Sequence, residues 1–213
     1  MSATPRKPAS PAWGHGRGLL LNAARDLFTR QGYDATTTRE IAEAAGVSEQ
    51  MVFRHFGSKA QLFEIAAVAP FIEHLDQYAS DWAERPPGVR DPVAEATDLY
   101  RGLYTVFSAN RALMSALLTV EADSQKAPSD AVGAALSPAL ERFSDLLRIE
   151  QNKRGFRDFD TAIVVRLVAG LALSQALFAD FMYSDSHTPP SVDAVIHEMA
   201  MLTIYGAWPP AHN

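Results

Sequence analysis

Three side chains that can distinguish one base from another lie close together at Glu49, Gln50 and Arg54. A Gln amide can donate to and accept from the edge of an adenine, and an Arg guanidinium can donate twice to a guanine or bind a phosphate. A Glu carboxylate can accept from the amine of a cytosine. Together with Met51, which is expected on the same outward face, this set indicates contact with the base edges of DNA.

Two short helices joined by a glycine turn are expected to position these side chains. Thr37 and Glu40 have the spacing of a capping box, so a helix should begin near Thr38. That helix should end at Gly46, because glycine takes the left-handed conformation at little cost. Ser48 is then expected to cap a second helix, which buries its apolar side. The sequence therefore predicts a helix-turn-helix whose second helix enters a major groove.

A second group of side chains around this motif is expected to bind phosphates. Lys59 should lie in the first turn of the next helix, where free amide N–H groups and the helix dipole already favour an anion. The residues assigned to phosphates are Thr37, Thr38, Arg39, His55 and Lys59. The complete set expected at DNA is Thr37, Thr38, Arg39, Ser48, Glu49, Gln50, Met51, Phe53, Arg54, His55 and Lys59.

The residues that would pack and terminate these helices recur at fixed spacings over positions 17 to 65. They are Leu27, Phe28, Gly32, Tyr33, Thr37, Ile41, Ala42, Ala45, Gly46, Val47, Ser48, Phe53, His55, Phe56, Ser58, Lys59 and Leu62. This segment resembles the N-terminal domain of the tetracycline-repressor (TetR) family of bacterial transcription regulators. The resemblance implies a repressor that binds a palindromic operator as a dimer and is released by a small hydrophobic ligand.

Phe53 departs from the pattern of the family, which usually has a tyrosine at this position. Phenylalanine cannot donate to a phosphate, and the loss of one neutral hydrogen bond costs roughly 0.5 to 1.5 kcal/mol. Phe53 could instead touch sugar or a thymine methyl group, or it could pack against Phe56 and the first helix.

The distribution of charge is compatible with DNA binding at one end of the chain. The 213 residues carry a net charge of -6, but residues 1 to 60 hold eight Lys and Arg against five Asp and Glu. A local basic excess is typical of a segment that meets a polyanion. The chain has no cysteine and no apolar signal segment near its start, and Ala162 to Phe181 is interrupted by polar side chains. We therefore expect a cytoplasmic protein with no membrane partner.

Helical periodicity continues to the end of the chain, and no strand pattern is found. Helices are expected at 17–30, 61–84, 91–109, 110–124, 128–153, 160–183 and 191–206, in addition to the two of the helix-turn-helix. Pro70 should either kink or split its helix, and Pro138 should break or kink another. The prediction is an all-α fold of nine or ten helices.

Three segments are expected along the chain. Residues 1–16 should form a flexible arm, because they are rich in Pro and Gly and poor in apolar side chains. Residues 17–62 should form the helix-turn-helix domain. Residues 63–208 should form a larger helical bundle for ligand binding and dimerisation.

The last two helices, 160–183 and 191–206, are apolar on more than one face. A helix of this kind is buried on both sides, so we expect part of their surface to pair with the same helices of a second chain. The alternative is a core formed within one chain. A dimer with two linked helix-turn-helix domains would also bind a palindromic operator far more tightly than a single domain would.

A ligand pocket is expected among the middle helices, where aromatic side chains and side chains with polar tips gather. The candidates are Phe71, His74, Tyr78, Trp82, Tyr100, Tyr104, Phe107, Met114, Phe143, Gln175, Phe178 and Met182. Taken singly, each fits ordinary core better than a pocket, since apolar stripes at helical spacing are typical of cores. The ligand is expected to be small and hydrophobic, and no spacing of His or acidic residues indicates a metal or a cofactor.

Two other interpretations remain. The chain could regulate by occupying its operator without any ligand. It could also be a helical enzyme, but it has no GxSxG or HExxH motif, no phosphate-binding glycine loop and no paired catalytic carboxylates. We therefore expect no enzymatic activity.

Overall fold

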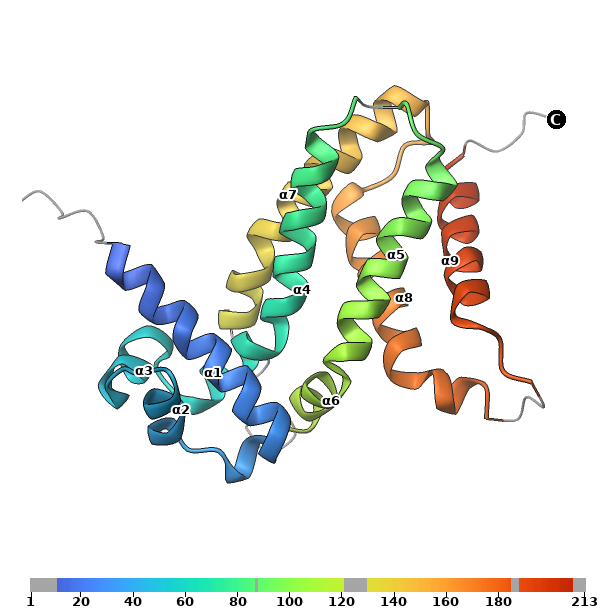
Figure 1. Cartoon of the computed structure of the whole chain (residues 1–213). Coiled ribbons are helices and arrows are strands. Elements are labelled where there is room, and N and C mark those ends of the chain that lie inside the picture. The colour runs from blue at the N-terminus through green and yellow to red at the C-terminus, as the bar shows by residue number, and fades with distance from the viewer. Residues whose placement is uncertain (1–10, 87, 121–129, 185–187, 209–213) are drawn as a thin grey trace, which may run out of the picture.

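The computed structural model describes residues 11–86, 88–120, 130–184 and 188–208. In these ranges every regular element is a helix, which confirms the expected all-α fold (Figure 1). The helices are α1 (Pro11–Ala35), α2 (Thr38–Ala44), α3 (Glu49–Phe56), α4 (Lys59–Ala83), α5 (Pro92–Ala109), α6 (Arg111–Val120), α7 (Asp130–Arg154), α8 (Thr161–Met182) and α9 (Val192–Ala207).

Helix α1 begins earlier than the sequence indicated. Residues 1–16 were expected to form an arm, but the helix starts at Pro11, and residues 1–10 lie outside the described residues. Proline fits a first helical position, because its fixed φ suits a helix and its missing N–H would have no partner there. At the other end, Gly32 has φ 80° and leaves the helical region, as expected.

The three N-terminal helices share a small core that the start of α4 completes. Leu20 and Phe28 of α1 are buried together with Ile41 of α2 and Val52 of α3. Phe63 of α4 reaches into this core, and its ring meets that of Phe28 edge-on with centroids 5.0 Å apart. The helix-turn-helix domain formed by α1 to α3, here called the head, is therefore packed directly onto α4. Helix α4 leads into the larger helical part formed by α4 to α9, here called the body.

Helix α4 runs through the middle of the molecule and joins the two ends (Figure 1). It packs against α1 and α3 at the head and against α5, α6 and α7 in the body. Helix α5 packs in turn against both α8 and α9. Helix α6 touches α1 as well as α4, so the head meets the body at two places.

Pro70 and Pro138 do not divide their helices. Pro70 lies inside the continuous α4, and Pro138 lies inside the continuous α7, so of the alternatives expected at each proline, a kink or a break, the break is not found. A proline removes one backbone hydrogen bond, whereas these two helices pack along each other over much of their length. The tertiary packing therefore outweighs the local defect.

The expected helix ends are found in the body. Asp91 caps α5, with Pro92 at its first position, and the Asp91 carboxylate accepts from the N–H of Ala94 at 2.8 Å. Asp160 caps α8 by accepting from two N–H groups. Gly155, with φ 66°, ends α7.

Helix α8 is long and apolar enough to cross a membrane by length and composition alone, although only 22% of its most apolar window is buried. It packs against α5 and α7, as a helix of a globular body does. Its exposed apolar side chains, such as Leu167 and Phe181, are therefore not accounted for by packing within one chain.

Candidate DNA interface and body cavities

Helix α3 presents a polar face to the outside and an apolar face to the core. Val52 and Phe56 are fully or almost fully buried, whereas Gln50 and Arg54 are exposed. This division follows from the sequence, since residues 52 and 56 are one helical turn apart. Two of the side chains expected to contact bases are therefore accessible on the free surface of α3.

Glu49 is exposed as well, but its carboxylate is held by the preceding helix. The hydroxyl of Thr38 donates to Glu49 Oε1 at 2.6 Å, so α2 and α3 are joined beside the outward face. Ser48 occupies the expected cap position of α3, but its side chain makes no capping hydrogen bond. The Thr38–Glu49 contact is the side-chain link seen at the start of α3 instead.

The expected capping box of α2 is present in full. The hydroxyl of Thr37 accepts from the Glu40 N–H at 3.1 Å, and Glu40 Oε2 accepts from the Thr37 N–H at 2.8 Å. These bonds to Thr37 lower the pKa of the exposed Glu40 carboxyl. Because the Thr37 hydroxyl also donates to Glu40 at 2.9 Å, it must exchange that partner before it can donate to a phosphate.

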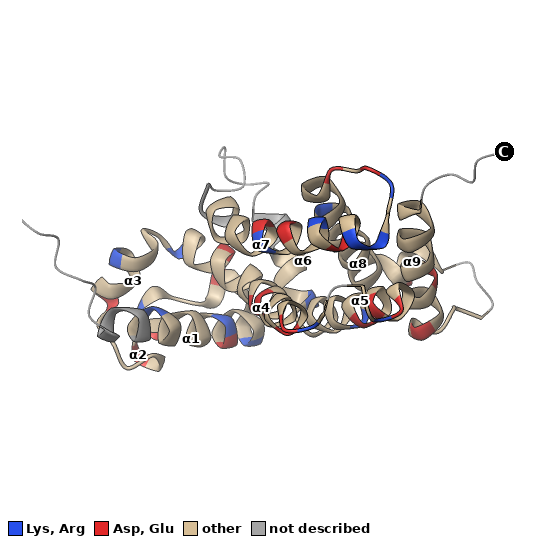
Figure 2. Ribbon diagram, turned by 90° about the horizontal axis from the view of Figure 1, so that it is seen from above, with Lys and Arg blue, Asp and Glu red and all other residues tan. Residues whose placement is uncertain are grey.

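The two cations assigned to phosphates lie at the edge of the head. The guanidinium of Arg39 is exposed and pairs with Glu43 one turn along α2, at 2.9 Å. Lys59 begins α4, and its ammonium lies over the ring of Tyr33, 4.3 Å from the centroid. Along the described helices, Lys and Arg residues are interspersed with Asp and Glu residues (Figure 2).

Two of the expected DNA contacts are less accessible than the sequence indicated. Met51 is half-buried and packs against the core, and its methyl group lies close to Gly16 of α1. His55 is half-buried, and its Nε2 atom is buried. The helical spacing placed both outside, but the N-terminal part of α1 covers Met51.

Phe53, in contrast, is 50% exposed and does not belong to the core around Phe56. Of the two roles that the sequence left open, packing against the first helix is therefore not the one observed. An exposed phenylalanine on α3 is available for an apolar contact outside the protein.

The candidates for a ligand pocket divide between core and cavity. Phe71 and Phe107 stack on each other with centroids 5.0 Å apart, and Met114 is buried with them. His74 is half-buried against Gly102, and burial lowers the pKa of its imidazole. These four side chains line neither the cavity at Tyr78 and Trp82 nor those at Tyr100 and Tyr104.

Three other candidates line an apolar cavity of about 70 Å³ inside the body. Tyr78 and Trp82 come from α4, and Phe143 comes from α7; the rings of Trp82 and Phe143 lie 5.2 Å apart. Further lining comes from α5, α7, α8 and α9, and from Phe156 between α7 and α8. These helices therefore enclose a cavity, which is small, and its use as a ligand pocket stays a prediction.

A second cavity of about 240 Å³ borders the first and includes the candidate Tyr100. Tyr104 and Gln175 line a separate hollow of about 450 Å³ near Val192. Phe178 and Met182 are exposed on α8 and line none of these spaces. The candidates thus do not form one site.

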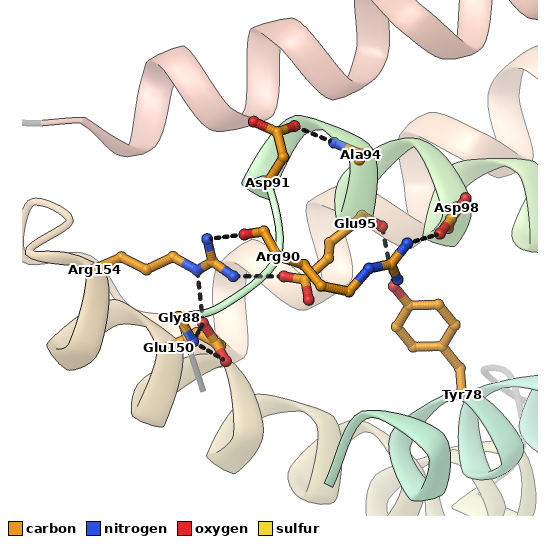
Figure 3. Close-up of polar contacts among 9 residues, drawn as sticks. All are labelled: Tyr78, Gly88, Arg90, Asp91, Ala94, Glu95, Asp98, Glu150 and Arg154. Carbon is orange, nitrogen blue, oxygen red and sulfur yellow. Dashed lines mark hydrogen bonds and ion pairs between the residues drawn. The ribbon is translucent and has the colours of Figure 1, made fainter. Parts of the chain in front are cut away.

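The sequence did not indicate a buried ionic network at the end of the first cavity (Figure 3). Arg154 on α7 donates to Glu150 at 2.6 Å and to Glu95 on α5 at 2.7 Å. It also donates to the backbone carbonyl of Arg90 at 2.8 Å, while Glu150 accepts from the N–H of Gly88. Only the Glu150–Arg154 pair has a spacing that could have signalled contact, because Glu95 lies far away in the sequence.

Burial governs the protonation of this network. Desolvation raises the pKa of the Glu95 carboxyl, and the neighbouring Arg154 guanidinium opposes that rise. The hydroxyl of Tyr78 donates to the backbone carbonyl of Glu95 at 3.0 Å, and burial raises the pKa of this phenol. Among the described residues no group of three or more His, Cys, Asp or Glu is placed to hold a metal.

Comparison with known proteins identifies the head. Residues 20–66 match the model of "Bacterial regulatory proteins, tetR family". The chain is 38% identical over 82 residues to the transcriptional activator FasR of Mycolicibacterium smegmatis and 53% identical over 86 residues to the uncharacterized regulator YvkB of Bacillus subtilis. These matches cover 38% and 39% of this chain, and they span only 32% and 37% of the relatives' lengths.

Solved structures match over most of the chain, but with low identity. Thermus thermophilus FadR, a repressor solved with lauroyl-CoA, has a TM-score of 0.62 and 22% identity, with coverage of 92% of this chain and 99% of the other. Bacillus subtilis FadR, solved with stearoyl-CoA, has a TM-score of 0.61 and 12% identity, with coverage of 89% and 98%. Residues 20–66 therefore form a helix-turn-helix domain of the TetR family, and the chain has the fold of that family's bacterial regulators.

Proposed function

We propose that this protein is a transcriptional repressor that binds a palindromic DNA operator as a homodimer. The observation that carries the proposal is the outward face of α3, where Gln50, Phe53 and Arg54 are exposed within a domain of the TetR family. A relative from Mycobacterium tuberculosis is named a repressor, whereas FasR is named an activator. The matched relatives are named regulators of transcription, and we propose no enzymatic activity.

We propose that the two parts of the chain have different functions. Residues 17–62 hold the DNA interface, and residues 63–208 hold the dimer interface and the ligand cavity. Within the interface, we assign Glu49, Gln50 and Arg54 to bases, and Lys59 to a phosphate.

The dimer interface is proposed at the outer face of α8 and α9. Both helices pack on α5, yet they leave large apolar side chains in solvent. These exposed side chains are Ile163, Leu167, Phe178, Phe181, Leu202 and Tyr205. Large exposed apolar side chains gathered on two helices mark an interaction site, and a second copy would cover them without any membrane partner. A cytoplasmic location agrees with this arrangement.

Ligand binding would act through the connections between body and head. Helix α4 carries Lys59 at its start and Tyr78 and Trp82 at the inner cavity, without a break between them. A ligand that widens this cavity would tilt α4 and change the separation of the two heads. Half-sites in successive major grooves lie about 34 Å apart, so a modest change would release the operator.

The small volume of the inner cavity favours a second candidate, a regulator that acts by operator occupancy without a ligand. The two candidates differ in one measurement. An operator complex of the full chain is titrated with small hydrophobic molecules, and DNA release is followed by fluorescence anisotropy. Release of the DNA when the protein is saturated with one of these molecules supports the ligand-controlled repressor. If the DNA stays bound in the presence of every molecule that binds the protein, control by occupancy is supported.

Two substitutions test the assignment of the DNA contacts. Lys59→Ala should weaken binding to all DNA sequences alike. It should also reduce the slope of log affinity against log salt concentration by about one, because one phosphate contact is lost. Gln50→Ala should cost about 1 to 3 kcal/mol at one base position and leave the salt slope unchanged. Equal losses for both variants over a library of operator variants would contradict the assignment.

A further inference from the structure

Phe53 is an exposed apolar side chain in the head. The large apolar side chains exposed in the described part of the head are Leu19 of α1, at 38%, and Phe53 of α3, at 50%. Phe53 is neither buried in the core nor among the partly buried side chains packed against it. Single exposed apolar side chains are common on proteins, so the position of this ring decides whether it has a function.

The ring of Phe53 lies among the side chains that we assign to bases. Residues three and four positions apart are neighbours on a helix surface, so Phe53 lies beside both Gln50 and Glu49. All three side chains are exposed. Helix α3 also lies at the end of the molecule opposite α9 (Figure 1). A major groove that receives Gln50 therefore receives the Phe53 ring as well.

The major groove offers a phenyl ring one apolar partner. Base edges present hydrogen-bond acceptors, amine donors and the C5-methyl group of thymine. A phenyl ring makes no hydrogen bond to the first two, but it can pack against the methyl group. Placed on a phosphate, the ring would displace water from a charged group and return no hydrogen bond. The thymine methyl is therefore the partner that suits this side chain.

We propose that Phe53 selects a thymine in each half-site by packing against its C5-methyl group. The inference rests on the proposed operator binding and adds one residue to its sequence preference. The tyrosine that is usual in the family carries a hydroxyl that can bind a phosphate, a contact that is the same for every sequence. Phenylalanine lacks that contact but keeps a ring that distinguishes thymine from cytosine, because cytosine has no methyl group at C5.

Operators that contain deoxyuridine test this contact. Deoxyuridine pairs with adenine as thymidine does and lacks only the C5-methyl group. The thymines of an operator selected from random DNA are replaced one at a time, and the affinity of the full-length protein is measured by fluorescence anisotropy. At one thymine of each half-site, the replacement should weaken binding about fourfold, the value expected for one buried methyl group. Equal affinity for all these operators would overturn the proposal.

A methylated cytosine tests the same contact from the other direction. The selected thymine–adenine pair is replaced by a cytosine–guanine pair, with or without a methyl group at C5 of the cytosine. The 5-methylcytosine operator should bind about fourfold more tightly than the unmethylated one, because the methyl group is restored at the same place. Equal binding of the two operators would contradict the proposed contact.

Two alanine variants assign the effect to one ring. In Phe53→Ala the thymine and deoxyuridine operators should bind equally, whereas Leu19→Ala, which removes the other exposed apolar side chain, should keep the fourfold ratio. If Phe53→Ala bound every operator more weakly but kept the ratio, the ring would contact sugar or phosphate and the proposal would fail. Equal effects of both variants on the ratio would also overturn it. Thermal denaturation followed by circular dichroism checks that both variants are folded.

The first measurement separates this inference from the proposed function. Binding of the unmodified operator by the wild type is determined before any base is replaced. Failure to bind any operator would refute the proposed function itself. Tight binding without an effect of the thymine methyl would refute the role of Phe53 alone.

Discussion

The hydroxyl of Thr38 on α2 lies 2.6 Å from Glu49 Oε1 on α3 and donates a hydrogen bond to it. This bond connects the two helices of the helix-turn-helix at the edge of the proposed base-reading face. It orients a carboxylate that would otherwise be a mobile, exposed side chain. In the proposed DNA complex, Glu49 would therefore have one of its oxygens already occupied.

Thr38→Val should loosen this orientation and change base preference more than stability. The bond is exposed, so its loss should lower the free energy of unfolding by less than about 1 kcal/mol. Discrimination at the base pair facing Glu49 should fall severalfold, as measured by anisotropy with single-base operator variants. Thr105→Val, on the exposed surface of α5, is the control. Unchanged discrimination in Thr38→Val would show that this bond does not orient Glu49 for reading a base.

The capping box of α2 should make the head sensitive to acid. Because its bonds to Thr37 lower the pKa of Glu40 in the folded protein, its contribution is complete above the unfolded pKa near 4.5 and disappears as the pH falls through the lower folded value. Denaturation of the wild type and of Glu40→Gln should therefore show a stability difference at neutral pH that shrinks in acid. Asp26→Asn removes an equal charge from the exposed surface of α1, away from the cap and from the Arg39–Glu43 pair. The same pH dependence in both variants would exclude the cap as its cause.

Local signals such as this cap could be read from the sequence because their partners are three or four residues apart. The same holds for Asp91 before α5, and for the burial of Val52 and Phe56. The accessibility of Met51 could not be predicted, since it depends on where the N-terminal part of α1 lies. The contact between Arg154 and Glu95 could not be predicted either, because it joins helices that meet only in the folded body.

The residues predicted to line a ligand pocket likewise depend on tertiary packing that the sequence does not reveal. Aromatic residues at helical spacing occur both in cores and around cavities, so the sequence could not separate Phe71 and Phe107 from Tyr78 and Trp82. The first pair stacks within the core, whereas the second pair reaches a cavity. The difference is set by which helices diverge, and that follows from packing over the whole body.

Removing the buried cation should be far more harmful than removing an exposed one. Arg154→Met leaves Glu95 and Glu150 without their counter-charge and should lower the free energy of unfolding by about 3 to 5 kcal/mol. Arg90→Met breaks an exposed ion pair with Asp98 and should cost less than about 1 kcal/mol. Urea denaturation monitored by Trp fluorescence measures both. Similar losses for the two variants would mean that the network does not hold α5 against α7.

Charge on the outer face of α8 and α9 should separate the dimer. Leu202 is 69% exposed, and an arginine there would be buried without a partner in the proposed interface. Leu202→Arg should sediment as a single chain of 23.2 kDa, while the wild type sediments with twice that mass. Val89→Arg alters an equally apolar exposed residue on the loop between α4 and α5 and should remain dimeric. A wild type that sediments as one chain would contradict the proposed dimer.

Selection of bound sites from random double-stranded DNA by the full-length protein tests the central claim most directly. Two copies related by a twofold axis should enrich a palindrome, with half-sites whose centres lie about one helical turn apart or a multiple of it. Each half-site should lose its preference at one position when Gln50→Ala replaces the wild type. Enrichment of no sequence, or of a single half-site without symmetry, would contradict the account of this protein as a dimeric operator-binding regulator.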